Sequence, residues 1–289
     1  MAGIPMVPLD RIRPNPRNVR ADLGDLSELA ASIRTRGVQQ PLVVVPQGAA
    51  RPYLLLDGHR RYAAAEIAGL SAVPCIASTD RTDEQQDAHM IAADPSGKYV
   101  FSTDLGLDRL YQYRFDDRTG KLTPNDPPFI SASSKGAGPR HFVFTPKGDA
   151  LWLINEEAST LTHYTVNANG TLKEGKTLSA LPEGYKGTSF AAGLALSADG
   201  KQLYVANRLH NSIGHFTVTA EGTLTHQDDV WTRGDYPRTL TLDKQGHWLY
   251  VMNQRSDNIT RFRVAQDGKL SFEPDYTPVG SPSQMVISP

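Results

Sequence analysis

Hydrophobic residues follow two different periods along the chain. Between residues 25 and 36 they recur every three or four positions, which predicts a helix with one buried face made by Leu26, Leu29, Ala30 and Ile33. Asp25 suits the start of this helix and Gly37 its end. Two short aliphatic runs follow, at 41–45 and 53–56, and the second leads through a glycine turn into an alanine-rich helix over 62–68. This part of the chain therefore predicts a small α/β (α+β) fold.

From residue 87 onward the period becomes two and the chain repeats itself. Turn glycines mark the repeat, at spacings of 51, 52 and 46 residues: Gly97, Gly148, Gly200 and Gly246. A second set follows the first by 22 or 23 residues: Gly120, Gly170, Gly222 and Gly268. Units of roughly 50 residues with four short strands are typical of β-propeller blades. We therefore predict an all-β partial β-propeller of about four blades. β-Helix units are much shorter, and helical solenoids lack this alternation.

The basic residues indicate where the two parts meet. Residues 1–86 contain ten Arg and no Lys, whereas residues 87–289 contain ten of each. The stretch 78–88 is polar and has no apolar period, so we place the domain boundary there. The predicted domains are 1–86 and 87–289.

Composition narrows the class of protein. Hydrophobic residues make up 39% of the 289 residues and charged residues 21%, as in ordinary globular proteins. Thirty basic residues against 31 acidic ones exclude a whole-chain basic footprint for nucleic acid. The single Cys75 excludes an internal disulfide framework and a cysteine-built zinc site. There is neither an apolar run long enough for a membrane span nor a signal peptide, so we expect a cytoplasmic protein.

The first part carries a candidate anion site. A glycine-containing turn from strand into helix presents free backbone N–H groups, and Arg60 and Arg61 add charge that suits a phosphate. The alternative is that both arginines are solvated residues of the first helical turn. Residues 37–41 (GVQQP) and 57–64 (DGHRRYAA) resemble the N-terminal domain of ParB-type partition proteins, whose boxes surround a bound CTP. The resemblance implies that CTP contacts Gly37, Gln40, Gly58, Arg60 and Arg61. Because no helix-turn-helix is present, we expect no sequence-specific DNA binding.

The repeat shows a second candidate site where its units differ. Eight residues before each first-set glycine stand His89, Arg140, Ala192 and Arg238, and eight after it stand Leu105, Glu156, Arg208 and Gln254. The column seven residues after each first-set glycine is nearly uniform (Asp104, Asn155, Asn207 and Asn253), which indicates a scaffold role in every blade. The varied columns begin one strand and end the next, so we expect them to face the axial channel near one rim. A histidine, a glutamate and several arginines there could combine an acid or base with an anion clamp.

For two residues of this site, Arg238 and His141, a purely structural role is at least as well supported as a substrate-binding role. Arg238 is as well suited to a structural ion pair as to a substrate contact. His141 follows Arg140 on the same strand and should point the opposite way, which favours a packed or hydrogen-bonded role. We keep both as candidate substrate-binding residues.

Four segments then resemble a second known family, the seven-bladed propeller lactonases of the 6-phosphogluconolactonase and carboxymuconate cyclase type. They are residues 87–90 (DAHM), 138–142 (GPRHF), 155–156 (NE) and 207–213 (NRLHNSI). The resemblance covers about 200 residues and implies hydrolysis of a small anionic sugar-acid lactone without a metal or cofactor. It makes His89 and Glu156 the acid/base candidates, while Arg140 and Arg208 hold the substrate's phosphate or carboxylate and stabilise oxyanion charge.

Three hypotheses remain open at this stage. The chain is a lactonase-type enzyme whose first three blades are missing, a nucleotide-binding module carrying an inert propeller, or a chimera in which neither activity is intact. Residues 281–287 repeat only the opening of a fifth unit. A propeller left with open edges would also invite self-association.

Overall fold

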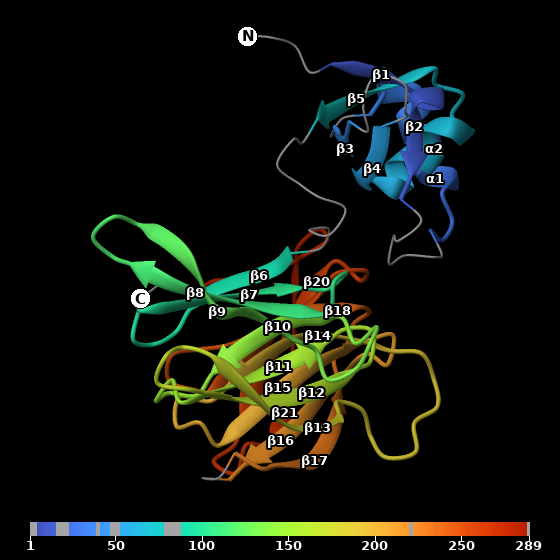
Figure 1. Cartoon of the computed structure of the whole chain (residues 1–289). Coiled ribbons are helices and arrows are strands. Elements are labelled where there is room, and N and C mark those ends of the chain that lie inside the picture. The colour runs from blue at the N-terminus through green and yellow to red at the C-terminus, as the bar shows by residue number, and fades with distance from the viewer. Residues whose placement is uncertain are drawn as a thin grey trace. The chain divides into compact units, whose positions relative to one another are not determined.

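The computed structural model describes residues 5–15, 23–38, 41–46, 53–77, 88–219 and 222–287. The chain divides into two compact units, Met1–Asp87 and Ala88–Pro289 (Figure 1). We call them the N-terminal unit and the propeller unit.

The N-terminal unit is built on a five-stranded sheet of order β1-β5-β3-β4-β2. Its strands are β1 (Met6–Pro8), β2 (Ile12–Pro14), β3 (Leu42–Val45), β4 (Tyr53–Asp57) and β5 (Ala72–Ala77). The 3-10 turn η1 (Leu9–Arg11) joins the first two strands, and helices α1 (Ser27–Arg36) and α2 (His59–Ile67) share the sheet's core. Leu42, Val44, Leu55, Ala64 and Cys75 are fully buried there.

Local chemistry explains where both helices begin and end. The Oδ1 atom of Asp25 accepts hydrogen bonds from the backbone N–H and the hydroxyl of Ser27, ahead of the first turn of α1. Gly37 ends α1 with φ at 70°, a conformation that favours glycine, and its N–H donates to the carbonyl of Ile33. Gly58, with φ at 99°, lets α2 begin directly after β4, three residues earlier than predicted.

The predicted fold class, a small α/β ParB-like domain followed by a partial propeller, is wrong for this chain, which is nearly all β. The described helices are short, with 10 residues in α1, nine in α2 and three in η1, while five sheets supply the rest of the regular structure. Sequence analysis did not find β1, β2 or β5. The first two have three residues each and end in proline, so they show no alternation from which a strand could be predicted.

The propeller unit consists of four antiparallel four-stranded sheets in chain order. Sheet 1 holds β6 (Ala88–Ala93), β7 (Tyr99–Asp104), β8 (Arg109–Asp116) and β9 (Lys121–Ser131). Sheet 2 holds β10 (Pro139–Phe144), β11 (Ala150–Asn155), β12 (Thr160–Val166) and β13 (Leu172–Ser179). Sheet 3 holds β14 (Phe190–Leu196), β15 (Gln202–Arg208), β16 (Ser212–Val218) and β17 (Leu224–Trp231). Sheet 4 holds β18 (Pro237–Leu242), β19 (Trp248–Asn253), β20 (Asn258–Val264) and β21 (Leu270–Pro278).

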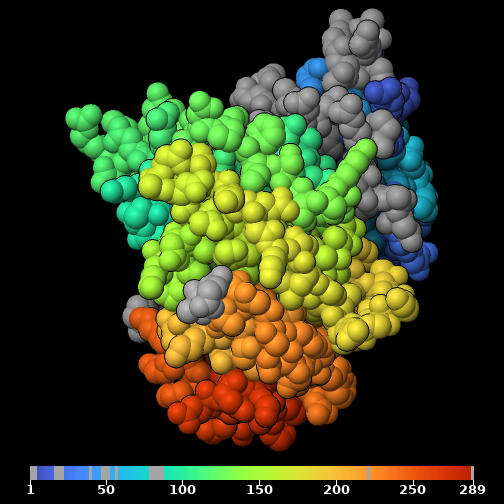
Figure 2. Space-filling view, turned by 60° about the horizontal axis from the view of Figure 1, so that its bottom comes forward, coloured from blue at the N-terminus to red at the C-terminus, as the bar shows by residue number. Residues whose placement is uncertain are grey.

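Apolar layers between successive sheets hold the propeller unit together. One residue of each layer comes from the third strand of a sheet and packs toward the preceding sheet: Tyr164, Phe216 and Phe262, all fully buried. The colours of Figure 2 pass from green through yellow and orange to red across this unit, as expected when consecutive repeats lie side by side. Burial of these alternating faces is the main favourable term for the sheet stack.

The uniform column has the scaffold role that its uniformity indicated. Asn155, Asn207 and Asn253 are fully buried at the ends of the second strands, and each side-chain amide donates to a side chain at the start of the following strand: Thr160, Ser212 and Asn258. Asp104 accepts a hydrogen bond from the backbone N–H of Leu107 at 3.0 Å. These bonds close the same turn in all four sheets.

Residues 281–287, which we call the C-terminal segment, lie along the outer face of β18. The hydroxyl of Thr239 donates to the Ser283 carbonyl at 2.8 Å, and that of Thr241 donates to the Met285 carbonyl at 3.2 Å. Both pairs are 44 residues apart, close to one repeat. The segment therefore occupies the place that the first strand of a fifth sheet would take.

Among the described residues, no helix has the length and apolar character that crossing a membrane requires.

Candidate functional site

A β-bulge at the start of each first strand positions the varied column. In sheet 1 the register shifts between Ala88 and Met90, so His89 has no partner across the ladder. The same shift makes Arg140 the extra residue of β10 and Arg238 the extra residue of β18. Bulges redirect a side chain and are frequent beside active sites. Sheets 1, 2 and 4 thus each present one redirected histidine or arginine, whereas in sheet 3 the shift lies between Ala191 and Leu194.

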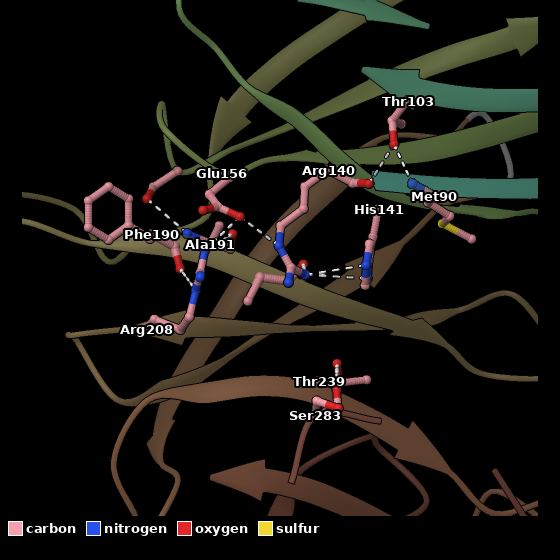
Figure 3. A network of polar contacts seen from close by, with 12 residues as sticks. Met90, Thr103, Arg140, His141, Glu156, Phe190, Ala191, Arg208, Thr239 and Ser283 are labelled. Carbon is pink, nitrogen blue, oxygen red and sulfur yellow. Dashed lines mark hydrogen bonds and ion pairs between the residues drawn. The ribbon is translucent and has the colours of Figure 1, made fainter. Parts of the chain in front are cut away.

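Glu156 is the centre of the site. It follows β11, and its Oε2 atom lies 2.6 Å from Nε of Arg140 and 2.8 Å from Nη2 of Arg208 (Figure 3). The two arginines come from sheets 2 and 3 and are almost completely buried, whereas the Glu156 side chain is 15% exposed. One carboxylate therefore joins two guanidinium groups from neighbouring sheets.

Backbone carbonyls of β14 fix both arginines. Nη1 of Arg140 donates to the Ala192 carbonyl at 2.6 Å, and Nε of Arg208 donates to the Phe190 carbonyl at 3.1 Å. The Arg208 guanidinium also lies 5.1 Å from the ring centre of Tyr236. These contacts use the buried N–H groups that would otherwise lose their hydration without replacement. The cations are therefore held in place by the fold.

Opposing effects set the charge of this cluster. Burial acts to raise the pKa of Glu156, but the charges of Arg208 and Arg140 outweigh it and hold that pKa below its usual value. Burial lowers the pKa of Arg140 to about 10, so this side chain remains protonated at neutral pH. Arg140 and Arg208 together exceed the carboxylate that they share by one positive charge, which suits an anionic ligand.

Two histidines adjoin the arginines. The rings of His89 and His141 meet edge to face with centroids 4.9 Å apart. Burial, aided by the charge of Arg140, lowers the pKa of His89 to about 4 and that of His141 to about 2. Both are therefore neutral at pH 7. Nδ1 of His89 is buried and has no hydrogen-bond partner among the described residues.

Most residues of the sequence-based propeller site come together, although their chemical roles stay predictions. His141 differs from its expected orientation: both ring nitrogens lie 3.4 Å from Nη1 of Arg140. The bulge at Arg140 explains this, because it breaks the simple alternation along β10. Arg238 is half-buried, and its charge contributes to the low pKa values of both histidines.

Two features of the site could not be predicted from the sequence pattern. Tyr236, with φ at 61°, places its hydroxyl 3.5 Å from Nη1 of Arg208. Ala192 is the member of its column without a polar side chain, and its backbone carbonyl accepts a hydrogen bond from Arg140. The sequence signal for this role is that Ala192 is a small residue in a column that otherwise holds histidine or arginine.

The residues proposed for CTP lie in the N-terminal unit. Arg60 donates to the carbonyls of Leu23 and Asp25, at 2.5 and 3.2 Å, and Nη1 of Arg61 donates to the Pro41 carbonyl at 2.7 Å. Gly37 and Gly58 have the positive φ angles given above, and Gln40 lies outside the described residues. Both arginines thus make backbone contacts that tie the helices to their loops.

Within the described ranges, no group of three or more His, Cys, Asp or Glu side chains is arranged to hold a metal ion.

Comparison with protein families gives two matches. Residues 71–287 match the family described as "Lactonase, 7-bladed beta-propeller", and residues 1–93 match the ParB N-terminal domain. The first match covers most of the chain, and the two overlap at the boundary between the units.

Individual relatives agree with the first match. The 6-phosphogluconolactonase of Bacillus subtilis is 33% identical over 157 residues, which are 54% of this chain and 44% of that protein. The periplasmic gluconolactonase PpgL of Pseudomonas aeruginosa superposes with a TM-score of 0.64 at 32% identity, over 68% of this chain and 55% of that one. A putative 6-phosphogluconolactonase of Bacteroides fragilis gives 0.62 at 26% identity, over 82% and 65%. The chain spans less than half the length of the Bacillus relative.

Proposed function

We propose, from the premise that this chain belongs to the lactonase family of seven-bladed β-propellers, that its arginine cluster binds an anionic sugar lactone and supports its hydrolysis. The observation that carries the proposal is the pair of short contacts from Glu156 to Arg140 and Arg208. Relatives named for 6-phosphogluconolactone and gluconolactone hydrolysis support the substrate class.

The charge states favour one division of roles between the two acid/base candidates. Glu156 is ionised and engaged by two guanidinium groups, so it orients the arginines. His89 is neutral and lies beside Arg140, so its ring can take the proton from the attacking water. The water oxygen adds to the lactone carbonyl carbon, and Arg140 or Arg208 stabilises the oxyanion that forms. The ring C–O bond then breaks, its oxygen takes the proton that His89 accepted, and a sugar acid leaves.

Hydrolysis assays with two substrates test this function. Wild-type protein should hydrolyse 6-phosphogluconolactone faster than spontaneous opening, and gluconolactone with a higher KM, because the cationic excess binds the phosphate. His89→Ala should lose at least 100-fold in kcat, the usual contribution of a positioned base. A wild-type rate equal to the spontaneous one for both lactones would refute the proposal. So would an unchanged rate in His89→Ala.

Nucleotide binding by the N-terminal unit is a second candidate function, favoured by the match of residues 1–93 to the ParB N-terminal domain. Calorimetric titration of the full chain with CTP tests it, with Arg60→Ala as the weakened variant and Arg36→Ala as the control for loss of one positive charge. Absence of heat with wild-type protein would remove this candidate.

A further inference from the structure

The outer face of sheet 1 carries side chains that the other three sheets bury. Six residues before its first-set glycine, sheet 1 has Ile91. The equivalent residues of sheets 2, 3 and 4 are Phe142, Leu194 and Leu240. Phe142 and Leu240 are 3% exposed and Leu194 packs into the layer toward sheet 2, whereas Ile91 is 62% exposed. A large apolar side chain at this position is thus packed against the preceding sheet in sheets 2, 3 and 4, and is exposed in sheet 1.

The outer strands repeat this difference. Leu122 is 38% exposed, while its equivalents Leu172, Leu224 and Leu270 all pack against the preceding sheet. Phe115 at the end of β8 is 36% exposed, and its equivalent Val166 packs in the layer between sheets 1 and 2. Three strands of sheet 1 therefore present apolar groups at positions that elsewhere form the contact with a preceding sheet.

Turn glycines show the same pattern independently of side-chain burial. A Cβ atom on Gly170 would lie 2.0 Å from the ring of Tyr99 in the preceding sheet, and one on Gly222 would lie 2.9 Å from His163. One on Gly268 would lie 2.4 Å from Gln202. The equivalent Gly120 has nothing within 4 Å. The turn keeps room for a neighbouring sheet that the described part of the chain does not supply.

We infer that the outer face of sheet 1 is a docking surface for a β-propeller segment supplied by another polypeptide. The segment ends in a complete four-stranded blade, whose aliphatic and aromatic face covers Ile91, Phe115 and Leu122. Blade faces of this chemistry cover the equivalent positions at all three junctions inside the propeller unit. Exposed apolar patches of this kind mark interaction sites.

The position of the C-terminal segment shows where the other end of the partner would pair with this chain. It also makes a second copy of this chain an unsuitable partner. It is seated on Thr239 and Thr241, where the first strand of a fifth sheet belongs. A second copy would have to place its own β6 there, so the seated segment blocks that pairing. What fits instead is a set of three strands that complete a blade around this segment.

The lengths of this propeller unit and of its Bacillus relative are consistent with a partner of this size. Seven blades, the number in the family description, leave three beyond the four described sheets. With one first strand already present, the partner supplies three strands and two whole blades, about 140 residues at roughly 50 per blade. The 157 matched residues are 44% of the Bacillus relative, whose length is therefore about 360, and the described propeller spans residues 88–287. The excess of that relative is of the size that the docking surface requires.

Co-expression with a defined probe tests the inference. The probe is the tagged part of the Bacillus subtilis 6-phosphogluconolactonase that lies outside its 157 matched residues. The matched part of the same protein, expressed with the probe, is the positive control for a probe able to bind. The full chain should co-elute with the probe as a one-to-one complex in size-exclusion chromatography with light scattering. Ile91→Asp should lower the bound fraction at least tenfold. Ile67→Asp, which alters an isoleucine 58% exposed in the N-terminal unit, should not.

Two results would overturn the inference. One is a chain that elutes alone while the positive control reassembles; the other is a homodimer that forms with or without the probe, which would identify a second copy as the occupant. Thermal melting of both variants shows whether Ile91→Asp acts on docking or on folding.

Discussion

At the scale of single residues, one carboxylate organises the candidate site. Glu156 contacts two buried guanidinium groups, each of which also binds a backbone carbonyl of β14. An ion pair of this kind is costly to break from one side, because the partner charge stays buried without compensation. The same residue thus contributes to stability and to the arrangement of the cations.

Glu156→Gln should therefore lower both stability and activity. We expect the free energy of unfolding to fall by about 2 kcal/mol, because a neutral amide replaces the shared counter-ion of Arg140 and Arg208. Urea unfolding measures the change. Asp275→Asn, which removes the exposed partner of Arg261, is the control and should cost less than about 0.5 kcal/mol. Equal effects of the two substitutions would show that the cluster is not held by Glu156.

The lowered pKa of His89 predicts how the rate of hydrolysis falls at low pH. Because the pKa of His89 is lowered to about 4, the residue stays neutral and able to accept a proton down to that pH. The kcat/KM for lactone hydrolysis should be level from pH 8 to pH 5 and fall with a midpoint near pH 4. Brief assays after a pH jump separate this limb from unfolding. A midpoint near 6.5 would contradict the assigned environment of His89.

At the scale of elements, the bulged first strands and the turn glycines decide how sheets meet. Much of this could be predicted from sequence: the repeat located the turns, the uniform asparagines and the column containing His89 and Arg140. The bulges could not be predicted, because the extra residue is the second of a six-residue strand and only one strand residue precedes it to show the change of phase. The orientation of His141 was therefore not predicted. In the N-terminal unit, β1 and β2 were missed because three residues are too few to show alternation.

Two glycines give a matched test of sheet packing. Gly170 and Gly120 are repeat equivalents with φ angles of 75° and 69°, so alanine costs about 1–2 kcal/mol at either through backbone strain alone. Only at Gly170 would the Cβ collide with the ring of Tyr99. Gly170→Ala should therefore destabilise the propeller unit by at least about 2 kcal/mol more than Gly120→Ala. Chemical denaturation compares them, and equal losses would contradict the described contact between sheets 1 and 2.

At the scale of the whole molecule, four stacked sheets bury cations and histidines around the start of their first strands. The arrangement links stability to pH. His89 and His141 bind protons more readily in the unfolded chain, where the pKa is about 6.5, than in the folded one. Their contribution is thus fully present above pH 6.5 and is lost as the pH falls toward the lowered values of about 4 and 2.

The free energy of unfolding should therefore fall by about 1–2 kcal/mol for each of the two histidines between pH 7 and pH 5. Calorimetric melting across this range measures the slope. His141→Gln should flatten it, because the group that the unfolded chain protonates is gone, and the exposed His247 supplies the control as His247→Gln. A slope unchanged in His141→Gln would show that His141 does not lie in the buried cationic environment described.

The most direct test of the account is calorimetric titration of the full chain with 6-phosphogluconate, the acid that the proposed hydrolysis releases. Binding depends on the cationic cluster and not on turnover. We predict saturable one-to-one binding that weakens at least tenfold in Arg208→Met, with gluconate binding more weakly than its phosphorylated form. Equal affinity of wild-type and Arg208→Met protein, or no binding at all, would contradict the assignment of this cluster as a site for an anionic sugar acid.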